Sequence, residues 1–119
     1  VDMGNPHIVV VVDSLDEAGE RMVSPVSCAE QFPDGVNIEL VRVIESRVVE
    51  MRVFERGVGE TWSCGTGACA VVAAVAGQDR PTTYAVKVRG GALIVTWAED
   101  DHIHLKGPAA LVAAGTWTA

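Results

Sequence analysis

The stretch from Glu55 to Gly77 changes composition halfway along, and this change limits the folds that the chain can adopt. Up to Gly67 it is rich in glycine and small polar residues, whereas every residue of Ala68–Ala76 is apolar. A helix that is apolar on all sides has to be buried in its own domain. A glycine-rich loop before such a helix is typical of an anion site at the helix N-terminus. We therefore expect a buried helix whose first turn faces a site.

The predicted helix at Ala68–Ala76 is short and thin. At about 1.5 Å of rise per residue it is roughly 14 Å long, and most of its residues are Ala or Cys. A sheet has to curl around such a helix to hide all its sides. The sequence therefore predicts an α+β fold, in which a strongly curved mixed or antiparallel β-sheet is wrapped around one central buried helix.

Apolar segments on both sides of this helix predict the strands of the sheet. In Val36–Leu40 the apolar residues alternate with Asn37 and Glu39, which predicts a strand with one wet face. A last apolar segment, Ala109–Trp117, follows the strands. The expected strands are Ile8–Val12, Val36–Leu40, Val48–Phe54, Thr82–Arg89, Ala92–Trp97 and His102–Lys106, and a short helix could open at Asp16–Ala18.

Length and charge narrow the functional classes. A chain of 119 residues suits one compact domain, so residues 1–119 are expected to form a single domain. The formal net charge of -7 argues against nucleic acid and anionic membranes as partners, since both reward clustered Lys and Arg. No stretch approaches the roughly 18 consecutive apolar residues that span a bilayer. The residues after Val1 lack the features of a signal peptide, which favours a cytoplasmic protein.

The cysteines divide into two kinds. Cys28, Cys64 and Cys69 are odd in number and match no zinc spacing, so neither a disulfide framework nor a metal site is expected. For Cys28 and Cys69 we favour a structural role as small buried residues. Cys64, in contrast, lies among glycines and hydroxyl residues at the start of the predicted helix. Unpaired amides and the helix dipole favour a thiolate at that position.

The same turn could bind a carboxylate. The backbone amides from Gly65 to Ala68 would be available at the helix N-terminus, and the glycines would let a ligand approach the backbone closely. Thr66 adds a hydroxyl group. A thiolate and a bound carboxylate would then lie side by side. This arrangement suits chemistry in which a sulfur base removes a proton next to a carboxylate.

Four segments occur in the order and spacing of a known family. They are Gly4–His7 (GNPH), Phe32–Asn37 (FPDGVN), Glu55–Thr61 (ERGVGET) and Cys64–Gly67 (CGTG). Over nearly its whole length the chain resembles the C-terminal half of the diaminopimelate epimerases, and the third and fourth segments are the most specific. The resemblance implies a cofactor-independent isomerase that inverts an α-carbon of diaminopimelate, in the synthesis of lysine and cell-wall precursors. In that family two cysteines face each other across the substrate.

The resemblance also implies roles for single residues. Cys64 matches the C-terminal acid/base thiol, and His7 and Glu55 match groups that assist the cysteines. The family fold, two similar domains that each wrap a sheet around a central helix, agrees with the predicted architecture, and a homodimer is a possible assembly. Substrate contacts are implied for Asn5, Asn37, Glu55, Arg56, Gly65 and Thr66, without a metal.

The chain departs from the family because the N-terminal half, with the second thiol in its own asparagine-cysteine-glycine-asparagine turn, is absent. Neither Cys28 nor Cys69 lies in such a turn. The hypothesis is that the chain is a C-terminal domain with half an active site, which needs the missing N-terminal domain as a partner and is inactive alone.

Two alternatives stay open. The first is a related racemase or isomerase of the same fold, such as proline racemase or the phenazine-biosynthesis isomerases, although Arg56 and the full ERGxGET run favour diaminopimelate. The second is a non-catalytic ligand-binding domain derived from this fold. Plainer interpretations also exist for single residues: Glu55 and Arg56 could form an exposed ion pair. A metal site at His102 and His104 is disfavoured, because no third ligand is placed there.

Overall fold

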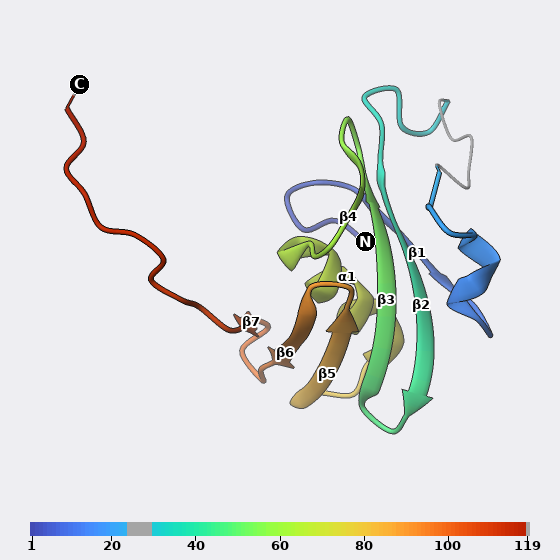
Figure 1. Ribbon diagram of the computed structural model, residues 1–119. Helices are drawn as coiled ribbons and strands as arrows, with labels where there is room; N and C mark the ends of the chain where they lie inside the picture. Colours follow the sequence, from blue (N-terminus) through green and yellow to red (C-terminus); the bar gives the residue numbers. More distant parts are fainter. Residues whose placement is uncertain (24–29, 119) are drawn as a thin grey trace.

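The structure is a computed structural model that describes residues 1–23 and 30–118. Within these residues seven strands form one mixed sheet, and the one α-helix, α1 (Gly65–Ala76), packs against it (Figure 1). The α+β class is therefore confirmed. The other elements are β1 (His7–Val11), the 3-10 helix η1 (Leu15–Ala18), β2 (Asn37–Glu45), β3 (Val48–Glu55), β4 (Gly59–Thr61), β5 (Thr82–Val88), β6 (Gly91–Trp97) and β7 (Ile103–Lys106).

The sheet has the strand order β1-β2-β3-β5-β6-β7, with β4 paired to β3. The β1–β2 and β3–β5 pairs are parallel and the other pairs are antiparallel, so the sheet is mixed. The two predicted hairpins, β2–β3 and β5–β6, are confirmed by their registers. The short strand β4, which the sequence did not indicate, brings the chain from the end of β3 to the start of α1.

Both faces of the first half of β2 are buried, so the predicted wet face is wrong. Glu39 is 0% exposed and Asn37 is 3% exposed. On one face Val41 packs with residues of α1 in the main core. On the other face Ile38 and Leu40 pack with Met22 in a second cluster that also includes residues of η1. Because each face has its own cover, alternating polar residues do not mark a solvated face here.

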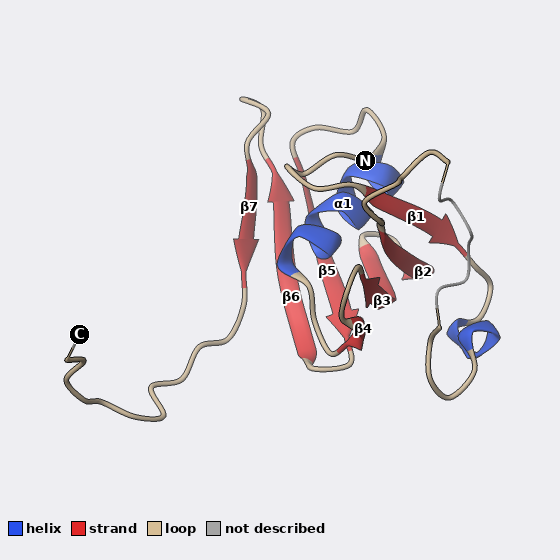
Figure 2. Cartoon of the chain, turned by 90° about the horizontal axis from the view of Figure 1, so that it is seen from above, coloured by secondary structure: helices blue, strands red, loops and turns tan. Residues whose placement is uncertain are grey.

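Helix α1 begins three residues earlier than predicted, at Gly65 instead of Ala68. Its buried residues run from Gly67 to Val72, whereas Ala74 is exposed. Within the predicted range Ala68–Ala76, the residues up to Val72 are buried, but the expectation of burial on all sides is wrong for the residues after it. The helix contacts β1 and β2 as well as β5, β6 and β7, as the view from above shows (Figure 2). No helix among the described residues is long and apolar enough to cross a membrane.

The chain after β7 leads away from the sheet (Figure 1). Residues 107–118 form neither helix nor strand and are exposed. The predicted last apolar segment, Ala109–Trp117, thus exists in the sequence but packs on nothing in the described part of the chain, and Leu111 and Trp117 are among its exposed side chains.

Candidate functional site

The topology gathers most of the predicted site residues at one end of the strands. The parallel strands β1 and β2 begin together, with His7 opposite Asn37. Strand β3 is antiparallel to β2 and therefore ends there, at Glu55. The first turn of α1 approaches the same place, since a Cβ atom added to Gly67 would lie 2.7 Å from Glu39 Oε1.

Cys64 is the N-cap residue of α1, which confirms its predicted position. It has the extended backbone expected of an N-cap, with φ -139° and ψ 116°. Its Sγ atom accepts a hydrogen bond from the Gly67 amide at 3.3 Å and lies 3.5 Å from Thr66 Oγ1. The sulfur therefore takes the place of the side-chain oxygen that usually caps a helix, and it lies at the positive end of the helix dipole.

Fewer backbone amides are available to an anion at this turn than predicted. The Ala68 amide donates to the Cys64 carbonyl at 2.9 Å, and the Gly67 amide donates to the sulfur. The amides of Gly65 and Thr66 have no acceptor in the described part of the chain. These two N–H groups, beside the thiol, are left to bind an anion.

His7 is buried and held from two sides. Its Nδ1 atom lies 2.7 Å from Glu39 Oε1, and its Nε2 atom lies 3.1 Å from Asn5 Oδ1. The side chains of His7 and Glu39 are both 0% exposed. The site therefore contains a line of polar groups, Asn5–His7–Glu39, in which Asn5 is half-buried and the other two are buried, and of which the sequence predicted only the first two.

Glu39 is the residue that sequence reasoning missed. Side chains two residues apart in a strand lie on the same face, so Glu39 shares a face with Asn37, which was predicted to be in the site. This two-residue spacing could have identified Glu39 from the sequence. Its Oε2 atom has no hydrogen-bond partner in the described residues. Burial raises the pKa of Glu39 above its ordinary value, while the hydrogen bond and charge of His7 oppose that rise.

Asn37 and Glu55 make contacts within the chain. Asn37 donates from Nδ2 to the Pro6 carbonyl at 3.0 Å and accepts at Oδ1 from the Arg56 amide at 3.1 Å. Its amide therefore ties the segment before β1 to the end of β3. The Glu55 carboxylate accepts a hydrogen bond from the Thr61 hydroxyl at 2.5 Å. The exposed Arg56 guanidinium has neither an ion pair nor a hydrogen bond to any described residue, so it is free to bind an anion.

Glu60, within the ERGVGET segment, belongs to a separate network. Its carboxylate pairs with Arg52 at 2.7 Å and Arg89 at 3.0 Å, and it accepts the Met22 amide at 2.7 Å. The hydrogen bond from Arg52 lowers the pKa of Glu60 to about 2, although burial opposes this. This part of the segment therefore anchors the loop after η1 to the sheet.

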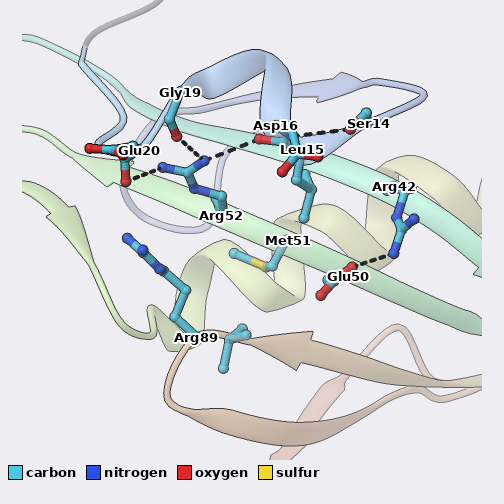
Figure 3. Close-up of a pocket in the computed structure, with 11 residues that line it drawn as sticks. Ser14, Leu15, Asp16, Gly19, Glu20, Arg42, Glu50, Met51, Arg52 and Arg89 are labelled. Carbon is cyan, nitrogen blue, oxygen red and sulfur yellow. Dashed lines mark hydrogen bonds and ion pairs between the residues drawn. The ribbon is translucent and has the colours of Figure 1, made fainter.

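A cavity of about 490 Å³ lies beside the same network (Figure 3). Arg42, Arg52 and Arg89 line it. All three are already paired, Arg42 with Glu50 and the other two with Glu60. Residues 42, 50 and 52 alternate with the residues that pack on α1, so they lie on the opposite face of the sheet. The cavity is therefore distinct from the site at Cys64.

The remaining candidates lie outside the site. Cys69 is buried in the core, and burial raises the pKa of its thiol. Cys28 falls outside the described residues. His102 is exposed and lies 3.2 Å from Asp100 through Nδ1, and no group of three possible metal ligands is found in the described ranges.

A family model and curated relatives point to the same family. Residues 1–112 match the family model described as Diaminopimelate epimerase. The chain is 49% identical to the diaminopimelate epimerase of Streptomyces coelicolor, with 97% of this chain and 43% of that protein covered. It is 46% identical to the diaminopimelate epimerase of Acidothermus cellulolyticus, with 97% and 39% covered.

The chain thus spans about two fifths of the length of the curated relatives that it matches. Among solved structures, a phenazine biosynthesis protein of the PhzF family from Bacillus anthracis matches with a TM-score of 0.48 and 16% identity. That match covers 82% of this chain and 33% of the other.

Proposed function

This chain belongs to the diaminopimelate epimerase family, and we propose that it supplies one of the two acid/base thiols of such an enzyme, Cys64. The observation that carries the proposal is the position of this thiol. Its sulfur caps α1 and accepts the Gly67 amide, beside the unpaired amides of Gly65 and Thr66. The proposed substrate is diaminopimelate, in the synthesis of lysine and peptidoglycan precursors, and the reaction uses no cofactor.

In the proposed reaction the Cys64 thiolate removes the proton from the α-carbon. The C–H bond breaks, an S–H bond forms, and the electron pair is delocalised into the neighbouring carboxylate. The amides of Gly65 and Thr66 donate hydrogen bonds to that carboxylate and stabilise the charge that develops on it. A second thiol on the other face of the carbon returns a proton, which inverts the centre. In the reverse direction the two thiols exchange roles.

The other predicted residues take supporting roles in this proposal. Arg56 binds a substrate carboxylate, since a guanidinium can donate two parallel hydrogen bonds to it. Glu55 receives an ammonium group of the substrate and assists Cys64, and His7 assists the thiol pair. Asn5 and Asn37 line the substrate. The contacts of Asn37 with Pro6 and Arg56 support this placement, because they hold those two segments at the same end of the sheet.

We also propose that residues 1–119 form one domain whose sheet wraps around α1. The contacts of the helix with β1 and β2 near one edge and with β6 and β7 at the other support this wrapping. The second thiol comes from a part of the longer protein outside this chain. The chain alone therefore has half of the active site and is inactive, and a homodimer is a further possible assembly.

Proton exchange at the α-carbon tests the role of the missing thiol. Diaminopimelate is incubated with the chain in deuterated water, and loss of the α-proton signal is followed by NMR. The chain alone should give no exchange above the rate without protein. Robust exchange catalysed by the chain alone would contradict the proposal of half an active site.

Thiol alkylation tests the site itself and needs no turnover. In a Cys28→Ser background, Cys64 should react with iodoacetamide faster than an ordinary exposed cysteine, and diaminopimelate should slow that reaction. Thr66→Val is a matched control, because it keeps the shape of the turn and removes the hydroxyl beside the sulfur. An ordinary rate without protection by the ligand would instead favour a non-catalytic domain.

A further inference from the structure

We propose that Glu39 is the positioning residue for His7. It holds the imidazole ring by Nδ1, so that Nε2 is the nitrogen presented toward Asn5 and the site. The proposal deepens the proposed function only in the use it gives to His7. The arrangement of the ring can be tested without catalysis. A negative result for Glu39 would therefore leave the proposed function standing, and a negative result for the proposed function would leave the role of Glu39 standing.

The contact between the two side chains is short and dry. Glu39 Oε1 lies 2.7 Å from His7 Nδ1, and both side chains are fully buried. A ring nitrogen in such a place needs a partner, because a buried polar group without a hydrogen bond destabilises the fold. The partner that one ring nitrogen has fixes what the other nitrogen can do. With Nδ1 taken by Glu39, Nε2 is the nitrogen left to contact Asn5.

Nε2 points toward the turn that leads into β1. It lies 3.1 Å from Oδ1 of Asn5, which is half-buried, whereas Nδ1 faces the interior. Asn5 lies in the turn that leads into β1, and Glu39 lies in the middle of the neighbouring strand β2. The ring is therefore held between a rigid strand and a turn, which leaves it little freedom to rotate.

Glu39 is itself fixed between His7 and helix α1. A Cβ atom added to Gly67 would lie 2.7 Å from Glu39 Oε1 and 3.3 Å from Cys64 Sγ. The carboxylate thus touches the first turn of α1 on one side and His7 on the other. Charged side chains that act on it include His7 and Glu55. Glu39 therefore connects His7 with the turn that carries the thiol.

Nitrogen-15 NMR of the histidine rings tests this assignment in the unmodified chain. The proton between His7 Nδ1 and Glu39 should exchange slowly with water and give a resolved downfield signal, and the two ring nitrogens should have distinct, fixed shifts. His104 is the internal reference, because it is exposed. A His7 ring with the same averaged nitrogen shifts as His104 would overturn the assignment.

Two substitutions of similar size then separate positioning from packing. Glu39→Leu should remove the downfield signal and move both nitrogen shifts of His7, whereas Glu39→Gln should keep the ring oriented, since its amide can still bond to Nδ1. The same changes at the exposed Glu50 on β3 are the matched controls and should leave His7 unaltered. If folded Glu39→Leu protein keeps the wild-type His7 signals, Glu39 has no positioning role.

Discussion

Gly67 lies where the candidate thiol meets the buried carboxylate. A side chain at this position would meet Glu39 Oε1 at 2.7 Å and the sulfur of Cys64 at 3.3 Å. A glutamate end usually moves aside easily, but this one is fully buried and held by His7 at 2.7 Å. The sulfur is likewise held, because it accepts the Gly67 amide. The absence of a Cβ atom is therefore a condition for both contacts.

Gly67→Ala should consequently destabilise the fold, although Ala favours helices over Gly by about 1 kcal/mol. The methyl group overpacks the space between helix and strand, which costs about 1–3 kcal/mol. Urea unfolding measures the change. Gly65→Ala is the control, because its nearest neighbour, the Leu105 side chain at 3.0 Å, is half-exposed and can move. Equal stability of the two variants would contradict this account of Gly67.

Single residues also show how far the sequence could reach. The position of Cys64 at the start of the helix was predicted correctly, because glycines and hydroxyl residues beside a cysteine are not typical of a hydrophobic core. Glu39 was missed because alternation shows which residues share a face, but it does not show what covers that face. Here α1 covers the face of β2 on which Asn37 and Glu39 lie, and α1 is far from β2 in the sequence. The burial of Glu39 could be learned only from the assembled fold.

At the scale of elements, β3 contributes one residue to each of two ion pairs, Arg52 to one and Glu50 to the other, and the two pairs differ in burial. Arg52 and Glu60 are 10% and 4% exposed, whereas Arg42 and Glu50 are 45% and 37% exposed. Glu60→Ala should lower the free energy of unfolding by about 3 kcal/mol, because it leaves the buried charge of Arg52 without a carboxylate and with only backbone carbonyls as acceptors. Glu50→Ala is the matched control and should cost at most about 1 kcal/mol. Chemical unfolding at neutral pH compares the two, and similar losses would contradict the difference in burial.

The same network predicts sensitivity to acid. The pKa of Glu60 is lowered from 4.5 to about 2, so its pairing stabilises the fold above pH 4.5 and is lost as the pH falls toward 2. A shift of this size corresponds to a loss on the order of 3 kcal/mol. Unfolding free energies measured from pH 6 to pH 2 should therefore fall more steeply for the wild type than for Arg52→Met. Parallel pH profiles would show that Arg52 does not lower the pKa of Glu60.

The boundaries of elements were harder to predict than their existence. The start of α1 was assigned three residues too late, because Gly65 and Gly67 are poor helix formers. The cap formed by Cys64 and the packing of Gly67 on Glu39 outweigh that preference. Strand β4 escaped notice because it is only three residues long and depends on pairing with β3.

At the scale of the whole molecule, two segments that are apolar throughout in the sequence are left partly uncovered. The second half of α1 includes the exposed Ala74, and the segment after β7 exposes Leu111, Val112 and Trp117. The all-apolar helix and the last apolar segment were visible in the sequence, but hydrophobicity does not say which partner covers a residue. A chain that spans two fifths of its relatives contains only some of the possible partners.

The terminal segment should therefore add little to the stability of the sheet. Residues 109–118 are exposed and make no hydrogen bond to the described residues, so deletion of residues 109–119 should change the free energy of unfolding by less than about 0.5 kcal/mol. Deletion from residue 102 onward is the contrasting variant. It also removes β7, which pairs with β6 from Ile94 to Trp97, and it should destabilise the protein clearly. Thermal unfolding of both variants tests this, and a large loss from the shorter deletion would show that the segment packs on the domain.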